Sequence, residues 1–215
     1  MKETNLQRID ESLLQEHSCL DATDYCYFLG EYAGGLGFKH SQMNQLINNL
    51  KKPIDRQHLP EWHYKEQAIQ QIAFLLMSTT VWNKLKSGTW VPMPPSKIKS
   101  DAAYDDCILR ILKRAQQFEE TLDIRELLLA KTSRNPAHTP GSKRPTIEDH
   151  SSNLIIDETL KGPLPNKAII IFDDIITTGS GFKAAQKILK NNFPDVPVIG
   201  VFVARNIKIA DSDEK

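Results

Sequence analysis

The segment of the chain that most restricts its fold lies between residues 168 and 182. The run Ala-Ile-Ile-Ile-Phe is continuously apolar and ends at two adjacent carboxylates, Asp173 and Asp174. A short apolar run of this kind is typical of a parallel strand buried on both faces. The segment 177–181, Thr-Thr-Gly-Ser-Gly, then supplies hydroxyls and closely approachable backbone N–H groups, and a helix is predicted over 182–190. Such a junction of strand and helix suits a bound phosphate.

Helical and strand patterns alternate along the chain. Three segments have apolar residues at helical spacing, 42–50, 64–80 and 101–120, and short apolar or aromatic runs predict strands at 25–32, at 89–97 with a proline-rich end, at 127–130 and at 198–203. This order predicts an α/β fold with a doubly wound, mostly parallel sheet and flanking helices. We expect an N-terminal extension and hood at 1–60, a main domain at 61–208 and a polar tail at 209–215.

Polar residues gather after three predicted strands, at Met93–Lys97, from Lys131 onward and at Asp173–Gly181. Ligands of doubly wound sheets bind beyond the carboxyl ends of the strands, so we expect these segments to share one crevice. Residues 131–153 are polar and predict a long loop. Loops longer than about a dozen residues are commonly functional lids, which makes this one a candidate lid. The alternative that Asp-Asp and Thr-Thr-Gly only cap a turn stays open.

The charge balance argues against several classes of function. The chain contains 27 Lys and Arg against 27 Asp and Glu, so it carries no net charge that would attract nucleic acid or an anionic membrane. No segment approaches the roughly 18 apolar residues that a membrane span needs. The first residues also lack the apolar core of a signal peptide. We therefore expect a cytoplasmic protein that does not associate with membranes. Direct binding of nucleic acid is not expected from the net charge but stays open through local basic patches.

Cysteines and the paired lysines have simple structural interpretations. Cys19, Cys26 and Cys107 show neither zinc-site spacing nor the even number of a disulfide framework, so we expect buried, reduced thiols. Lys51 and Lys52 follow the predicted helix 42–50. We expect both to be solvated at the helix end, where cations are favoured.

The run 170–181, Ile-Ile-Phe-Asp-Asp-Ile-Ile-Thr-Thr-Gly-Ser-Gly, resembles the phosphoribosyl pyrophosphate (PRPP) motif of type I phosphoribosyltransferases. Within that superfamily the chain is more similar to ComF-like proteins. Val91–Pro94 is similar to their Val-Pro-x-Pro strand end, Arg144–Asn153 resembles their Arg-x-x-Asn segment, and Val203–Arg205 is similar to their last strand. The resemblance covers residues 25 to 206, and the PRPP motif is its one highly specific part.

The resemblance implies a role for each matched residue. Asp173 and Asp174 are the implied catalytic residues and hold the 2- and 3-hydroxyls of the ribose. The implied binding residues for the 5-phosphate are Thr177, Thr178, Gly179, Ser180 and Gly181. The turn implied to face pyrophosphate consists of Pro94, Pro95, Ser96 and Lys97. Mg²⁺ is the implied cofactor, held chiefly by PRPP oxygens and not by direct protein ligands. The predicted lid residues are Lys131, Arg134, His138, Lys143 and Arg144.

Three departures from the family pattern bear on function. The Asn of the Arg-x-x-Asn segment is displaced relative to Arg144. Gly181 stands where the motif usually has Thr, which removes one hydroxyl from the phosphate site. ComF-like proteins often carry an N-terminal four-cysteine zinc module, and the cysteines for it are missing here, so no zinc is predicted.

The resemblance implies an enzyme that transfers the phosphoribosyl group from PRPP to a nitrogenous small-molecule acceptor and releases pyrophosphate. No residue of the hood indicates which acceptor. A second hypothesis is a non-catalytic PRPP- or nucleotide-sensing or accessory protein linked to DNA uptake or processing, because ComF-like proteins are associated with DNA uptake in competent bacteria. A third is an interaction protein with a vestigial site. Protein partners and a homodimer remain open.

Overall fold

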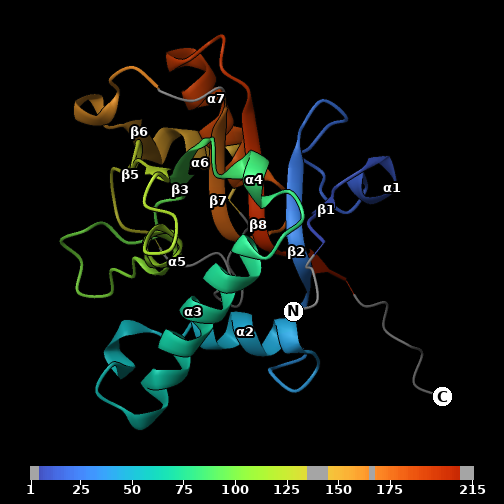
Figure 1. The fold of residues 1–215 in the computed structure, drawn as a ribbon, viewed down its shortest axis with the longest axis vertical. Coiled ribbons are helices and arrows are strands. Elements are labelled where there is room, and N and C mark those ends of the chain that lie inside the picture. The colour runs from blue at the N-terminus through green and yellow to red at the C-terminus, as the bar shows by residue number, and fades with distance from the viewer. Residues whose placement is uncertain (1–4, 135–144, 165–167, 209–215) are drawn as a thin grey trace.

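The computed structural model describes residues 5–134, 145–164 and 168–208 (Figure 1). Its helices are α1 (Glu11–Leu14), α2 (Gln42–Leu50), α3 (His63–Met77), α4 (Trp82–Leu85), α5 (Cys107–Gln116), α6 (Ile147–Asn153) and α7 (Ser180–Asn192). Its strands are β1 (Gln7–Arg8), β2 (Cys26–Ala33), β3 (Thr89–Pro92), β4 (Asp123–Ile124), β5 (Leu128–Ala130), β6 (Leu154–Ile156), β7 (Ile169–Ile176) and β8 (Val198–Ile207). Short 3-10 turns lie at Ile54–Arg56, Pro60–Trp62 and Glu158–Leu160.

A mixed, mostly parallel sheet forms the centre of the fold. Within the described part of the chain it has six strands in the order β1-β2-β8-β7-β3-β4. Neighbours from β2 to β4 pair in parallel, and β1 pairs antiparallel with β2 at one edge. The prediction of an α/β fold with a mostly parallel sheet and flanking helices is confirmed at this level.

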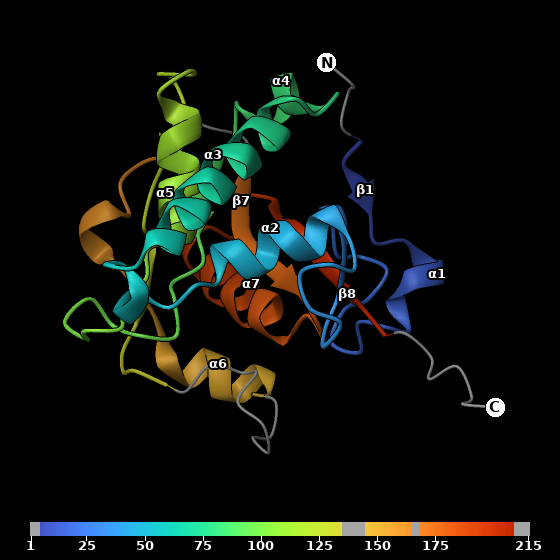
Figure 2. The ribbon, with the colours of Figure 1, turned by 90° about the horizontal axis from the view of Figure 1, so that it is seen from below.

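Strand β7 lies between two parallel neighbours, β8 and β3, and separates two cores. Ile170 and Phe172 belong to the core that also contains side chains of α2, α3 and α5. Ile169 and Ile171 belong to the second core, with side chains of α7. Figure 2 shows α3 and α5 at the top of the view and α6 and α7 below them. Successive side chains of a strand point to opposite faces, which explains why the whole apolar run is buried. Full burial contributes about 2 kcal/mol for each such side chain.

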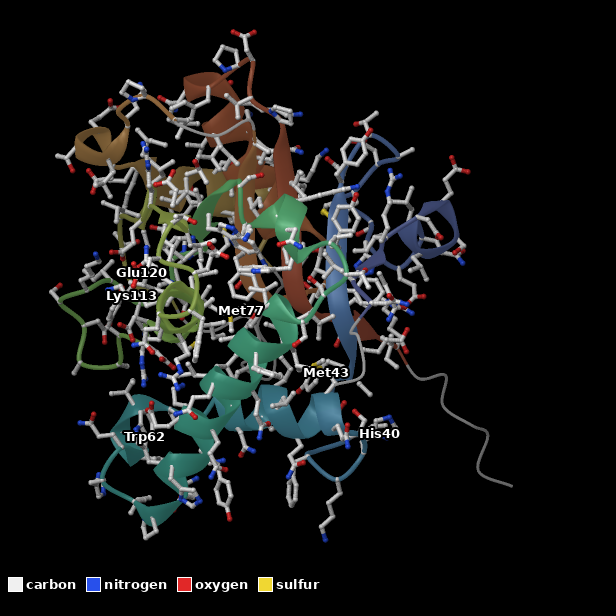
Figure 3. All side chains as sticks on the ribbon, in the orientation of Figure 1. His40, Met43, Trp62, Met77, Lys113 and Glu120 are labelled. Atoms are coloured by element: carbon white, nitrogen blue, oxygen red, sulfur yellow. The ribbon has the colours of Figure 1, made fainter. Side chains whose placement is uncertain are left out.

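Helix α2 has the bounds and the buried face that its sequence predicts. Ser41 caps it, since its Oγ accepts the Asn44 N–H at 3.0 Å. Ile47 and Leu50 are completely buried. Met43 on α2 and Met77 on α3, labelled in Figure 3, pack against the same core. This packing fixes the C-terminal end of α2 relative to the sheet.

Two predictions about the middle of the chain are wrong. Leu128–Ala130 is a strand, but it pairs antiparallel with β6 in a separate two-stranded sheet. The strand beside β3 is instead the two-residue β4, which is too short to leave an apolar pattern. The expected loop at 131–153 contains α6, which begins with a capping box between Thr146 and Asp149. Residues 135–144 of that loop lie outside the described residues.

Residues before position 60 contribute to the sheet as well as to its cover. Strand β2 pairs with β8 in parallel, with Phe28 opposite Phe202. The segment 1–60, predicted as an extension and hood, therefore contains β2, a strand of the main sheet. The polar tail at 209–215 lies outside the described residues. None of the helices within the described ranges has the length and apolar character needed to cross a bilayer. Cys26 and Cys107 are buried free thiols, whereas Cys19 is partly exposed.

Candidate functional site

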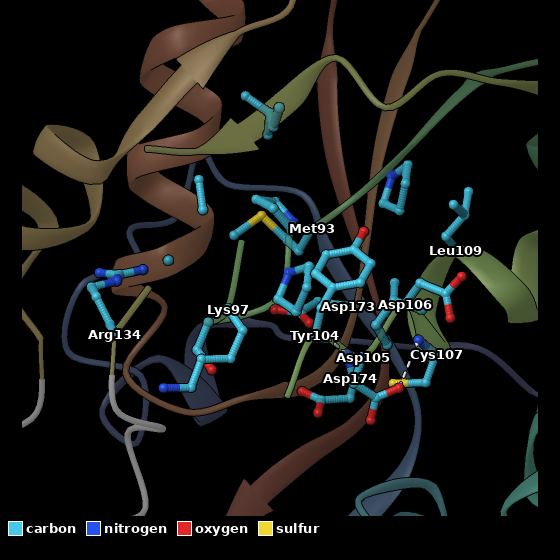
Figure 4. A pocket seen from close by; sticks show the side chains of 18 of the residues that line it. Met93, Lys97, Tyr104, Asp105, Asp106, Cys107, Leu109, Arg134, Asp173 and Asp174 are labelled. Carbon is cyan, nitrogen blue, oxygen red and sulfur yellow. Dashed lines mark hydrogen bonds between the residues drawn. The ribbon is translucent and has the colours of Figure 1, made fainter. Parts of the chain in front are cut away.

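A cavity of about 850 Å³ lies beyond the carboxyl ends of β3 and β7 (Figure 4). Its volume falls within the range typical of small-molecule sites. The predicted PRPP and pyrophosphate residues all line it: Pro94, Pro95, Ser96, Lys97, Asp173, Asp174, Thr177, Thr178, Gly179, Ser180 and Gly181. The structure thus brings the two predicted segments, which are about 80 positions apart in sequence, to one cavity.

Asp173 and Asp174 stand near the end of β7, partly buried between the apolar residues before them and the buried Ile175 and Ile176. Asp173 Oδ1 accepts the Asp174 N–H at 2.8 Å, and Asp174 Oδ1 accepts the Ile175 N–H at 2.6 Å. Each carboxylate therefore has its Oδ1 fixed by the backbone. The Oδ2 of Asp174 lies 3.0 Å from the ammonium of Lys51. Carboxylate oxygens are strong acceptors for the hydroxyls of a ligand.

The acidic pair is electrostatically unusual. Burial raises the pKa of Asp173 well above the ordinary range, and the adjacent charge of Asp174 raises it further. Two neighbouring carboxylates at the edge of a hydrophobic core cannot both ionise without cost. A perturbed carboxyl group in a cavity marks a candidate functional site.

Lys51 is a site residue that the sequence did not indicate. Its Nζ lies 3.0 Å from Asp174 Oδ2, so the expectation that it is solvated at the end of α2 is wrong. Burial opposes its charged form, but the charge and hydrogen bond of Asp174 outweigh burial and raise the pKa of Lys51. The lysine stays charged and neutralises part of the acidic pair. Its position depends on how α2 packs against the sheet, which no local pattern encodes.

The segment after β7 has the form of an anion site. Gly179 adopts the left-handed conformation, with φ of 86°, and leads into α7 without a side-chain cap. Among the described residues, no acceptor lies within hydrogen-bond distance of the N–H groups of Thr178, Gly179 and Gly181. Ser180 Oγ, 3.2 Å from Thr178 Oγ1, donates to the carbonyl of Pro145. Free N–H groups at the N-terminus of a 13-residue helix favour a bound anion.

Arg134 and His150 form the opposite wall of this anion site. Arg134 Nη2 lies 3.4 Å from His150 Nδ1, and Arg134 Nη1 donates to the Asp149 carbonyl at 3.4 Å. A Cβ placed on Gly181 would lie 3.7 Å from His150 Cε1, so the histidine contacts the start of α7. Burial lowers the pKa of His150 and the charge of Arg134 lowers it further, which favours the neutral imidazole. Of these two residues, Arg134 is therefore the one that supplies positive charge to the anion site.

The predicted lid residues have three different outcomes. Arg134 lines the cavity, and its backbone N–H donates to the Ser96 carbonyl at 2.7 Å, which joins the strap 131–134 to the proline-rich turn. Lys131 points elsewhere, since its Nζ donates to the Ser152 carbonyl at 2.8 Å. His138, Lys143 and Arg144 lie outside the described residues.

A second acidic pair, Asp105 and Asp106, also lines the cavity and was not singled out from the sequence. Lys65 is completely buried and donates to Asp105 Oδ2 at 2.6 Å. The same ammonium donates to the carbonyls of Leu50 and Lys52 at the C-terminal end of α2. Lys65 therefore ties the start of α5 to the segment that carries Lys51.

Cys107 lies between the two acidic pairs. Its thiol pKa is raised by burial and then by the charges of Asp105, Asp174 and Asp173. The thiol is therefore a poor nucleophile. Within residues 5–134, 145–164 and 168–208, no group of three or more His, Cys, Asp or Glu side chains could hold a metal ion.

The chain matches no protein-family model, and no curated protein is similar to it in sequence. The functional assignment therefore depends on the residues and geometry of the cavity.

Proposed function

We propose that the protein binds PRPP and belongs with the doubly wound, type I phosphoribosyltransferase-like proteins, in the ComF-like group. The observation that carries this proposal is the end of β7, where Asp173, Asp174 and the N–H groups of 178–181 open into one cavity. A sugar phosphate needs both kinds of group at this spacing, because its hydroxyls donate to carboxylates and its phosphate accepts from N–H groups.

The proposed pose places each part of PRPP against one segment. The ribose hydroxyls donate to Asp173 and Asp174, and the 5-phosphate lies at the start of α7 beside Arg134. Pyrophosphate lies along the 94–97 turn, where Lys97 offsets its charge. The magnesium implied by the resemblance accepts oxygen ligands, and with PRPP bound it supplies stabilisation of the charge on the leaving pyrophosphate. As the resemblance implies, oxygens of PRPP would hold the ion, and no direct protein ligand is proposed for it.

The reaction we propose is a substitution at the anomeric carbon. A nitrogen atom of the acceptor forms a bond to that carbon, and the bond from the carbon to pyrophosphate breaks. The charge of Lys97 in the 94–97 turn favours departure of pyrophosphate because negative charge develops on it. The side chains of the N-terminal segment, including Lys51 and Ile54, line the same cavity and would limit which acceptor enters.

The contact between Lys51 and Asp174 favours a second candidate function. A ribose hydroxyl that binds Asp174 Oδ2 must share this oxygen with Lys51 or displace the lysine. A non-catalytic sensing or accessory protein, linked to DNA uptake or processing, could use that displacement to report PRPP binding through α2.

Calorimetry with PRPP tests the site. The double variant Asp173→Asn, Asp174→Asn should lose measurable binding, because both carboxyl groups that accept from the ribose hydroxyls are replaced. The matched control is Asp195→Asn, Glu120→Gln, which removes the same charge at two exposed positions away from the cavity. Unchanged affinity in the first variant contradicts the site assignment.

Pyrophosphate release then separates the two candidates. The wild-type protein is incubated with PRPP, Mg²⁺ and a panel of nitrogenous bases. Release that depends on one base supports the transferase. Tight PRPP binding without release for any base supports the sensing or accessory protein.

A further inference from the structure

The N-terminal segment 16–24, which we call the brace, contacts the phosphate loop 177–179 at each of its three residues. His17 Nδ1 donates to the Thr177 carbonyl, and the Cys19 N–H donates to the Thr178 carbonyl at 2.9 Å. Leu20 covers Gly179 so closely that a Cβ there would lie 2.6 Å from its Cδ2. Three consecutive residues of the loop are therefore held from one side.

These contacts determine where the loop N–H groups point. In a trans peptide the carbonyl and the following N–H point in opposite directions. The carbonyls of Thr177 and Thr178 point toward the brace, so the N–H groups of Thr178 and Gly179 point away from it. Both residues line the cavity on that other side.

The brace is itself anchored to the body of the fold. Lys183 of α7 lies 2.8 Å from Asp21 Oδ2 and 2.8 Å from Asp24 Oδ2, and Asp24 is buried. Arg205 of β8 lies 3.1 Å from Glu16 Oε2. Anchors at both ends of the segment hold its centre against the loop.

A buried histidine at position 17 lowers the stability of the folded state relative to an apolar side chain. It is completely buried, and Nδ1 must carry the proton because the Thr177 carbonyl can only accept. Its Nε2 is buried with no hydrogen-bond partner among the described residues. An unsatisfied buried nitrogen destabilises the folded state. What the histidine provides is the Nδ1–H donor, which fixes the orientation of the Thr177 carbonyl.

We propose that the brace positions the phosphate loop and that His17 is its main positioning residue, turning the N–H groups of Thr178 and Gly179 toward the phosphate of a phosphorylated pentose. This inference rests on the proposed function. It assigns a role to an N-terminal segment whose sequence shows no motif.

Calorimetry on three variants tests the role of His17, with PRPP and ribose 5-phosphate as probes. His17→Leu keeps a side chain of similar size without a donor. We expect about 10-fold weaker binding of both probes, because a loop N–H that is no longer held in place loses its charge-assisted hydrogen bond to the phosphate. His17→Asn places an amide N–H near the position of Nδ1 and should restore affinity to within about 3-fold of wild type. Thr89→Val, which loses a partly buried hydrogen bond to Asp123 at the far end of β3, should bind like wild type.

The outcomes separate this inference from the proposed function. A wild-type protein that binds neither probe overturns the proposed function. Wild-type binding that is undiminished in His17→Leu, or reduced equally in Thr89→Val, overturns the role of His17 alone. If His17→Leu does not fold, the amide protons of Thr178 and Gly179 in ¹⁵N-labelled wild type remain decisive. Downfield shifts on saturation with ribose 5-phosphate support the inference, and unshifted amides overturn it.

Discussion

Two pairs of aspartates line the same cavity, and each pair is approached by a lysine. Asp174 lies 3.0 Å from Lys51, and Asp105 lies 2.6 Å from Lys65. The residue types match, but the surroundings do not. Lys65 has no exposed side-chain surface, whereas Lys51 is 32% exposed.

The number of acceptors around each lysine explains the difference. The Lys65 ammonium has three donors, and it uses them on Asp105 and on two carbonyls at the C-terminal end of α2, those of Leu50 and Lys52. Trp62, labelled in Figure 3, also lies 5.4 Å from this ammonium, measured to the ring centroid. Exchange of any of these partners would leave a buried charge uncompensated. Lys51 faces the cavity and can exchange Asp174 for a ligand. The same two residue types thus form a structural joint in one place and an exchangeable contact in the other.

The largest expected effect comes from the buried lysine. Lys65→Met should lower the free energy of unfolding by about 3 kcal/mol, because two carbonyls and Asp105 lose their donor in a buried site. Urea unfolding of the variant and of Lys51→Met measures the contrast. Equal destabilisation by the two substitutions would contradict the assignment of Lys65 to a structural contact and Lys51 to an exchangeable one.

The next effect concerns ligand affinity. Asp174→Asn should weaken PRPP binding at least about 10-fold, since a hydrogen bond to a charged acceptor is lost. Asp105→Asn removes the same charge from the same cavity, but its carboxylate is occupied by Lys65, so affinity should stay within about 3-fold of wild type. Calorimetry on both variants compares them directly. A larger loss in Asp105→Asn would reverse the assigned roles.

The pH dependence of stability should distinguish the pairs as well. The pKa of Asp173 is raised in the folded state, so its contribution is fully present below the unfolded value of about 4 and is lost as pH rises through the raised value. In Asp173→Asn the free energy of unfolding should therefore fall less as pH rises. At pH 8 the variant should be more stable than wild type by about 1 kcal/mol or more. Urea unfolding from pH 4 to 9 gives the curves. Asp105→Asn keeps Asp173 and should keep the decline.

The smallest effect isolates the exchangeable contact. Lys51→Met should change the free energy of unfolding by less than about 1 kcal/mol, because partly exposed ion pairs contribute little. The pKa of Asp173 should rise further, since the charge of Lys51 lowers it. Carbon-detected NMR of the side-chain carboxyl measures this shift, with Lys52→Met as the control. A lower pKa of Asp173 in Lys51→Met would contradict the electrostatic effect of Lys51 on Asp173.

Local patterns predicted the elements whose apolar residues follow a regular spacing or form a continuous run. The apolar run before Asp173 indicated β7, and the spacing within 42–50 indicated α2. The run at 127–130 indicated a strand but not its partner, because an apolar run does not encode which strand it pairs with. Helix α6 was not predicted because Ile147 is its one large apolar residue, so it lacks an apolar face. Its capping box at Thr146 and Asp149 was the local signal that could have revealed it.

The sequence alone determined a buried strand that ends in two carboxylates and a glycine-containing loop, because these follow from adjacent residues. Only the tertiary structure decided what surrounds that strand end. His17 and Thr177 are 160 positions apart, and the contacts of Lys51 and Lys65 depend on how α2, α3 and α5 pack on one face of the sheet. Contacts over such separations arise from the packing of whole elements, so no local sequence pattern predicts which residues make them.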